Sequence, residues 1–195
     1  MFRWDKDTFS GEIRAMRPIS EGEEITISYF QKIVTLGAMI YEPYRYLSEG
    51  YNFKCTCQIC ARPALVHAQS NIDRRVINTA VTGIGTYYRE MVYDWIVRGG
   101  NDPAHLLNYL STVEAALDQE MFSHPIPWIY LARAIVMVRC ALREGEAARK
   151  WAERAAQYSR ALSGSDGGWD AIAREPEKCE WWGMWSKPQF RRISA

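Results

Sequence analysis

The stretch NDPAHLLNYLSTVEAAL, residues 101–117, decides the architecture of this chain. Asn101 and Asp102 followed by Pro103 are typical of a helix N-terminus, because Asp caps the first turn and proline is tolerated there. Apolar side chains then recur at intervals of three or four residues, as Leu106, Leu110, Val113 and Leu117. This period predicts a helix with one face buried against neighbouring elements.

Further helices are predicted on both sides of this stretch. Ser70 and Asp73 resemble a capping box that starts a helix running to Gly99. The sequence HPIP, residues 124–127, is a breaker that precedes a helix from about Trp128 to Arg143. Gly145 separates a last helix, whose apolar stripe contains Trp151, Ala155, Tyr158 and Leu162. Such short connections predict antiparallel helices in a tetratricopeptide-like array, although we find no convincing 34-residue repeat.

The first sixty residues have a different pattern. Short strands are predicted around Phe2 and Trp4, over residues 12–17 and, most clearly, over 24–29, where β-branched residues alternate with polar ones. We therefore predict an α+β fold with a boundary near Arg62, in which a small β and loop region, 1–62, precedes a mostly helical domain, 63–195. The helical domain ends in a Trp-rich segment after a flexible joint at 163–168. That segment either folds back over an apolar groove or presents an aromatic surface to a partner.

Composition excludes several classes of function. Hydrophobic residues make up 48% of the chain and charged residues 24%, which is typical of a globular protein. The net charge of +1 provides no basic field for nucleic acid. No apolar run is long enough to span a membrane, and the N-terminus lacks the apolar stretch of a signal peptide. Three of the five cysteines cluster at Cys55, Cys57 and Cys60, which favours metal binding in a reducing compartment, the cytoplasm or the nucleus.

Two motifs together carry a resemblance to a known family. The string RPISEGEEITISY, residues 17–29, resembles the C-terminal half of a SET domain, and YNFKCTCQIC, residues 51–60, resembles the post-SET element that follows it. The helical remainder is similar to the SET proteins abundant in filamentous fungi, which are related to the SET-and-MYND methyltransferases. The resemblance implies that Tyr29 occupies the position of the active-site tyrosine. It also implies that Cys55, Cys57 and Cys60 are zinc ligands.

One motif of the SET family does not occur in this sequence. SET methyltransferases bind S-adenosylmethionine mainly through an N-terminal half with a Gly-rich segment and an Asn-His-Ser-Cys motif, and the printed sequence contains no Asn-His-Ser-Cys string. We therefore expect no S-adenosylmethionine binding and no methyl transfer. The family's fourth zinc ligand belongs to the same motif, while structural zinc takes four ligands. His67 is the nearest candidate replacement, and the alternative is a vestigial, metal-free cluster of cysteines.

A scaffold of this kind that does not methylate suggests a small-molecule enzyme. An apolar pocket without acid–base machinery suits cyclisation, because holding a polyene in a reactive conformation needs shape rather than a covalent step. We therefore predict a cyclase or pericyclase of fungal specialised metabolism that acts on a hydrophobic substrate and requires no cofactor. Tyr29 is the predicted catalytic residue, with core packing as its alternative role. The predicted pocket walls are Tyr51, Phe53, Trp128 and Trp151.

Two other functions stay open at this point. Helices that stack in an array commonly bind peptides or partner proteins, so the helical domain is also predicted as a non-catalytic interaction module. The third hypothesis is that the sequence is a fragment of a protein-lysine methyltransferase. An apolar surface on the remaining strands could also be covered by a second copy of the chain, so a homodimer is a further possibility.

Overall fold

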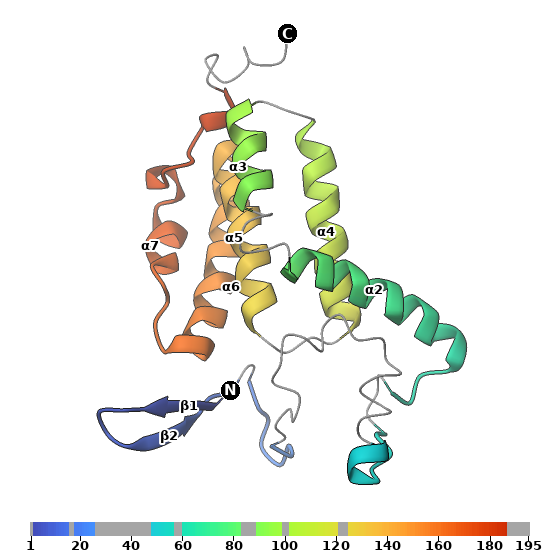
Figure 1. Ribbon diagram of the computed structural model, residues 1–195. Coiled ribbons are helices and arrows are strands. Elements are labelled where there is room, and N and C mark those ends of the chain that lie inside the picture. Colours follow the sequence, from blue (N-terminus) through green and yellow to red (C-terminus); the bar gives the residue numbers. More distant parts are fainter. Residues whose placement is uncertain are drawn as a thin grey trace.

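The chain folds mainly into helices (Figure 1). The computed structural model describes residues 2–15, 18–25, 48–56, 60–82, 89–98, 102–120 and 125–186. Its long helices are α2 (Ala64–Thr82), α3 (Arg89–Arg98), α4 (Pro103–Gln119), α5 (Pro125–Ala141) and α6 (Gly145–Ser163). The helical part of the predicted α+β fold is therefore confirmed.

The β-structure of the described residues is one hairpin. Strands β1 (Phe2–Asp5) and β2 (Ser10–Ile13) pair antiparallel, with Phe2 opposite Ile13 and Trp4 opposite Gly11. This confirms the short strand predicted around Phe2 and Trp4. Most of the strand predicted over 24–29 lies outside the described residues. The hairpin lies at one end of the helical array, below α6 in Figure 1.

Two helix starts differ from the prediction. Helix α2 begins at Ala64 rather than Ser70, and Ser70 is buried inside it instead of capping it. Its hydroxyl donates a hydrogen bond to a buried carboxylate, so a tertiary contact and not a cap explains the serine. Helix α5 begins at Pro125 because proline fits the first turn of a helix, where no amide hydrogen bond is lost. Residues 83–88, inside the single helix predicted up to Gly99, lie outside the described residues.

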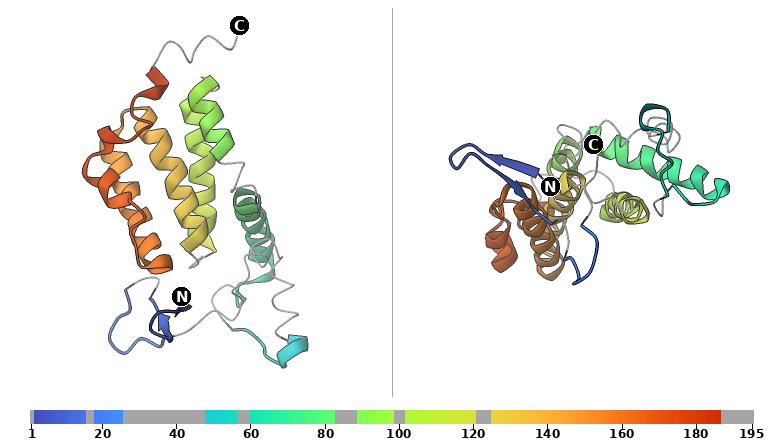
Figure 2. Two further views of the ribbon diagram at one scale, coloured as in Figure 1. Left: turned by 60° about the vertical axis from the view of Figure 1, so that its left-hand side comes forward. Right: turned by 90° about the horizontal axis from the view of Figure 1, so that it is seen from below.

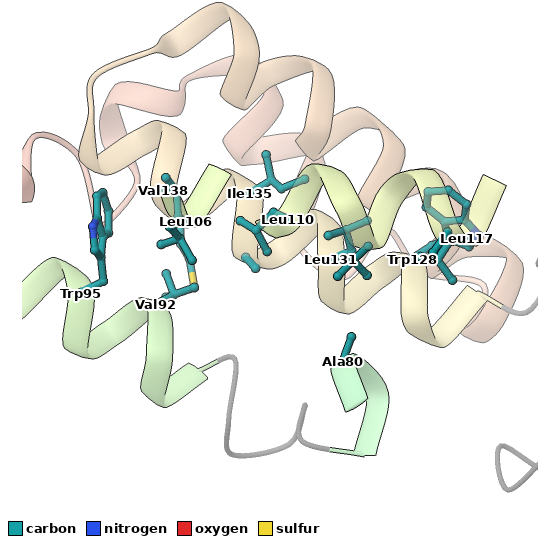
Figure 3. Close-up of a cluster of buried hydrophobic side chains, with 14 of the residues drawn as sticks. Ala80, Val92, Trp95, Leu106, Leu110, Leu117, Trp128, Leu131, Ile135 and Val138 are labelled. Atoms are coloured by element: carbon teal, nitrogen blue, oxygen red, sulfur yellow. The ribbon is translucent and has the colours of Figure 1, made fainter. Parts of the chain in front are cut away.

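Helix α5 lies at the centre of the array (Figures 1 and 2). It packs against α2, α3, α4 and α6, and it is apolar on nearly every side, as expected for a helix surrounded by others. The predicted stripe of α4, Leu106, Leu110, Val113 and Leu117, is buried against it (Figure 3). Small side chains on the buried face of α6 allow it to pack closely against α5. These are Ala148, Ala152, Ala155 and Ala156.

The C-terminal segment packs along α6 and over the C-terminal end of α5. It contains α7 (Trp169–Arg174) and two short 3-10 turns, η3 (Pro176–Lys178) and η4 (Met184–Ser186). The indole of Trp185 stacks on that of Trp95 in α3, with ring centroids 4.3 Å apart, and Trp181 meets Tyr93 edge to face at 5.9 Å. The described tryptophans of this segment are thus packed on the helices.

Two arginines join the N-terminal segments to the helices. The Arg14 guanidinium, beyond the hairpin, donates to the carbonyl of Arg160 in the last turn of α6 at 3.0 Å. The Arg62 guanidinium, just before α2, donates to the carbonyl of Gln119 at the end of α4. The last carbonyls of a helix lack partners within it and carry partial negative charge, so both contacts are favourable. Both lie at the same end of the array.

Candidate functional site

Helix α2 lies at the edge of the array and has two contrasting faces (Figure 1). Its inner face contains Ser70, Asp73, Ile77 and Ala80, all buried and spaced three or four residues apart. This face packs against α4 and α5. The helix is therefore held by its neighbours along one side, while the opposite side faces solvent.

A buried carboxylate holds α2 in place. Glu120, at the end of α4, is only 6% exposed, and a buried charge is costly unless it is paired and hydrogen-bonded. Its partners are the Ser70 hydroxyl, the Arg74 Nε at 2.7 Å and the Arg62 Nη1 at 3.1 Å. Glu120 thus joins α4, α2 and the segment before α2. Sequence reasoning missed it, although Glu120 extends the apolar stripe of α4 by one step of three residues.

The outer face of α2 is apolar with a positive edge. We define it as Leu65, Ala68, Ile72 and Arg75, which follow one another at intervals of three, four and three residues and are all exposed. Leu65 is 90% exposed and Ile72 is 52% exposed. The single acidic residue of α2, Asp73, is on the inner face and accepts a hydrogen bond from Gln69 at 2.9 Å. The helix itself therefore places no negative charge on its outer face.

Two of the predicted pocket walls, Trp128 and Trp151, lie together. The Arg154 guanidinium contacts both, with its carbon 5.0 Å from the Trp128 ring centroid and 4.5 Å from that of Trp151. Trp128 also stacks on Tyr158 at 5.5 Å and is only 3% exposed. Burial acts to lower the pKa of Arg154, but its hydrogen bond to Glu114, at 2.7 Å, helps to raise it overall. The Arg154 guanidinium thus lies over the rings of Trp128 and Trp151, where the predicted pocket would need open space.

The other two predicted pocket walls have a different environment. Tyr51 is 66% exposed and Phe53 is 52% exposed, whereas Trp128 is in the helical core. A surface hollow of about 570 Å³ is lined by none of the four. It is lined instead by Glu144, Gly145, Glu146, Ala147 and Lys150, at the start of α6.

The remaining predicted site residues belong to the SET-like motifs. Tyr29 and Cys57 lie outside the described residues. Cys55 and Cys60 are half-buried, and the Nε2 of His67 is buried with no hydrogen-bond partner within the described ranges. Across those same ranges, no three His, Cys, Asp or Glu side chains come together as a metal site. We therefore assign no zinc to the structure, and zinc binding by the three cysteines stays a prediction.

Comparisons with known proteins add no assignment. Models of protein families, curated proteins and solved structures all give no significant match to this chain. Among the helices that the structure describes, none combines the length and apolarity needed to cross a membrane.

Proposed function

We propose that this chain is a helical interaction module that binds an amphipathic protein segment along the outer face of α2. The observation that carries the proposal is the exposure of Leu65 and Ile72, 90% and 52%, on a helix whose inner face is fixed by the buried Glu120. A rigid helix with an uncovered apolar stripe is a common docking element for a second helix. Of the three hypotheses raised by the sequence, the interaction module fits this geometry best.

The charge of this surface specifies the chemistry of the partner. Arg75 lies on the outer face, and the acidic residue of α2 is turned inward toward Gln69. An approaching segment with apolar residues at helical spacing and glutamates beside them would bury Leu65 and Ile72 while placing negative charge near Arg75. Complementary charge raises the association rate and disfavours partners of the opposite sign. The proposed partner is therefore an amphipathic segment with acidic flanks.

The area of the surface limits the affinity. Burial of one leucine or isoleucine side chain contributes about 1.5–3 kcal/mol, and association costs several kcal/mol in lost freedom of motion. Two such side chains contribute about 3–6 kcal/mol before that cost, which is less than the roughly 8 kcal/mol of a micromolar complex, so we expect binding weaker than micromolar. The expected contact is therefore reversible and not a permanent subunit interface.

We also propose, from the motifs at 17–29 and 51–60, that residues 1–62 correspond to the C-terminal half of a SET domain and are attached to the helical module. The antiparallel hairpin and the arginine contacts at the ends of α4 and α6 are compatible with a small appended β region. The cyclase hypothesis stays a prediction, since Tyr29 lies outside the described residues and Arg154 occupies the faces of Trp128 and Trp151. A direct test is conversion of an apolar polyene by the purified chain.

Fluorescence anisotropy with two labelled peptides tests the interaction module. The probe is a 20-residue helical peptide with leucines at intervals of three and four residues and flanking glutamates; its matched control carries lysines instead. We expect the acidic probe to bind the full chain more tightly. Leu65→Ser and Ile72→Ser should each weaken binding about tenfold, the loss expected for one buried aliphatic side chain. Gln157→Ser, on the exposed side of α6 and away from this stripe, should leave the affinity unchanged.

Three results would contradict the proposal. Equal affinity for the acidic and basic probes would remove the role of charge. Unchanged affinity in both serine variants would place binding elsewhere. Sedimentation showing that the chain self-associates, and that Leu65→Ser abolishes this, would make a second copy the occupant of the surface. Circular dichroism of each variant checks that the helices remain intact.

A further inference from the structure

Two cysteines distant in sequence meet where the C-terminal segment covers the end of α5. Cys140 is in the last turn of α5 and is fully buried, and Cys179 follows η3 and is half-buried. Each residue donates a hydrogen bond to the same acceptor, the backbone carbonyl of Pro176. The Cys140 thiol donates to it at 3.8 Å, and the Cys179 amide donates to it at 3.0 Å. The two residues are thus held around a single oxygen atom.

The backbone on both sides of this contact is also fixed. The Gly183 amide donates to the Cys140 carbonyl at 2.9 Å, so the chain after Cys179 returns to the end of α5. The Trp182 amide donates to the Cys179 carbonyl at 2.9 Å, which closes a turn. Cys140, Cys179 and the indoles of Trp181 and Trp182 belong to one hydrophobic cluster. The thiols are therefore positioned by the fold and not by an accidental approach of two loops.

The thiols also interact with each other, and the interaction makes them unequal. A hydrogen bond with Cys140 lowers the pKa of Cys179 to about 7, against an opposing effect of burial. The same hydrogen bond, together with burial, raises the pKa of Cys140. Near neutral pH a substantial fraction of the partly accessible Cys179 therefore carries the thiolate, and the buried Cys140 keeps its proton. The thiolate is the nucleophilic form of cysteine.

We propose that Cys140 and Cys179 are a redox-active dithiol, in which Cys179 attacks a low-molecular-weight disulfide such as oxidised glutathione and Cys140 then resolves the product. In the first step the Cys179 sulfur forms a bond to one glutathione sulfur, the disulfide bond of glutathione breaks, and one glutathione thiolate leaves. In the second step the Cys140 sulfur attacks the Cys179 sulfur, the proton of Cys140 passes to the departing glutathione thiolate, and the second glutathione leaves as a thiol. Two protein thiols are oxidised and one glutathione disulfide is reduced to two thiols.

The disulfide would connect α5 to the C-terminal segment and close a loop of about forty residues. Such a cross-link restricts the unfolded chain, so it stabilises the fold. For a chain of this size we expect the midpoint of thermal unfolding to rise by roughly 5–15 °C on oxidation. The packing of the Trp-rich segment on the helices, through Trp181 and Trp185, would then depend on the redox state of the solution.

Incubation of the full reduced chain with oxidised glutathione tests this proposal. Peptide mapping by mass spectrometry should find a cross-link between the peptides that contain Cys140 and Cys179. Cys140→Ser cannot form the bond, so Cys179 should accumulate as a stable glutathione adduct, and the thermal shift should disappear. The matched control Cys55→Ser should still form the cross-link. A second measurement follows the rate of Cys179 alkylation against pH, which should have its midpoint near 7.

The alkylation measurement separates a specific thiol pair from general reactivity. Cys140→Ala removes the hydrogen-bond donor, so the midpoint should rise toward about 8.5, the usual value for cysteine. Cys140→Ser retains a donor and should keep the midpoint low. Failure to cross-link Cys140 to Cys179, a stable glutathione adduct on Cys179 with Cys140 present, or an unchanged midpoint in Cys140→Ala would each overturn the proposal. None of these results depends on binding at the outer face of α2.

Discussion

Aromatic side chains of similar size have opposite environments in two regions of this molecule. In the helical array, Trp128 is 3% exposed and Trp95 is 7% exposed, whereas in the segment before α2 Tyr51 is 66% exposed and Phe53 is 52% exposed. The difference follows from the neighbours that each region has. Helix α5 is surrounded by four other helices, while the described segment 48–56 contains only one helical turn. Burial is thus decided by what packs against a residue more than by its own hydrophobicity.

The largest effect should come from truncating a side chain in the centre of α5. Leu131 is 1% exposed within the core cluster, so Leu131→Ala should lower the free energy of unfolding by about 2–5 kcal/mol through lost burial and a residual cavity. Phe53, in the segment before α2, is 52% exposed, and Phe53→Ala should cost less than about 1 kcal/mol. Urea unfolding measures both. Equal costs would abolish the distinction between the two regions.

The next largest effect should come from the buried carboxylate that links the two regions. Glu120→Gln removes the charge that pairs with Arg62 and Arg74, and we expect a loss of about 2–4 kcal/mol. Glu114→Gln is the matched control, because that carboxylate is 28% exposed and, within the described ranges, its ion pair is with Arg154. Its cost should stay below about 1 kcal/mol. If denaturant curves show the opposite order, Glu120 is not the anchor of α2.

A smaller effect should follow from disturbing the contact between Arg14 and α6. Gly164 ends α6 with φ +83°, and a Cβ there would lie 2.4 Å from an Arg14 nitrogen. Gly22 has φ +79° with open space around it, so Gly22→Ala introduces the backbone strain alone, about 1 kcal/mol. Gly164→Ala should cost up to about 1 kcal/mol more, since the flexible Arg14 can swing away but loses its hydrogen bond. Hydrogen exchange should then show faster exchange in the hairpin for Gly164→Ala only.

The smallest effect should occur on the outer face of α2. Leu65→Ser replaces a side chain that is 90% exposed, and stability should change by no more than about 0.5 kcal/mol. The same variant is expected to weaken peptide binding about tenfold. A thermal scan beside the anisotropy measurement therefore separates a binding role from a structural one. A large loss of stability would show that Leu65 is packed in the folded protein.

The helices could be predicted from the sequence, because helical periodicity is a local property. The stripe of α4 from Leu106 to Leu117 was found from its spacing and is buried as expected. The predicted starts of α2 and α5 were wrong, because Ser70 resembles a cap and Pro125 resembles a breaker when each is considered alone. A pocket was predicted at Trp128 and Trp151, but Arg154 lies against both rings. The contact of Arg154 with Trp128 joins two helices, so sequence spacing does not predict it.

The order of the residues alone therefore determines where the chain forms helices and which stripe of α4 turns inward, since hydrogen bonds within a helix and side-chain spacing are set within a few residues. Only the tertiary structure brings Ser70 and Arg74 to Glu120, and Cys140 to Cys179. It also leaves Leu65 and Ile72 exposed on α2. Contacts of this kind depend on how helices pack against one another, and that packing is set by the fit of many side chains at once.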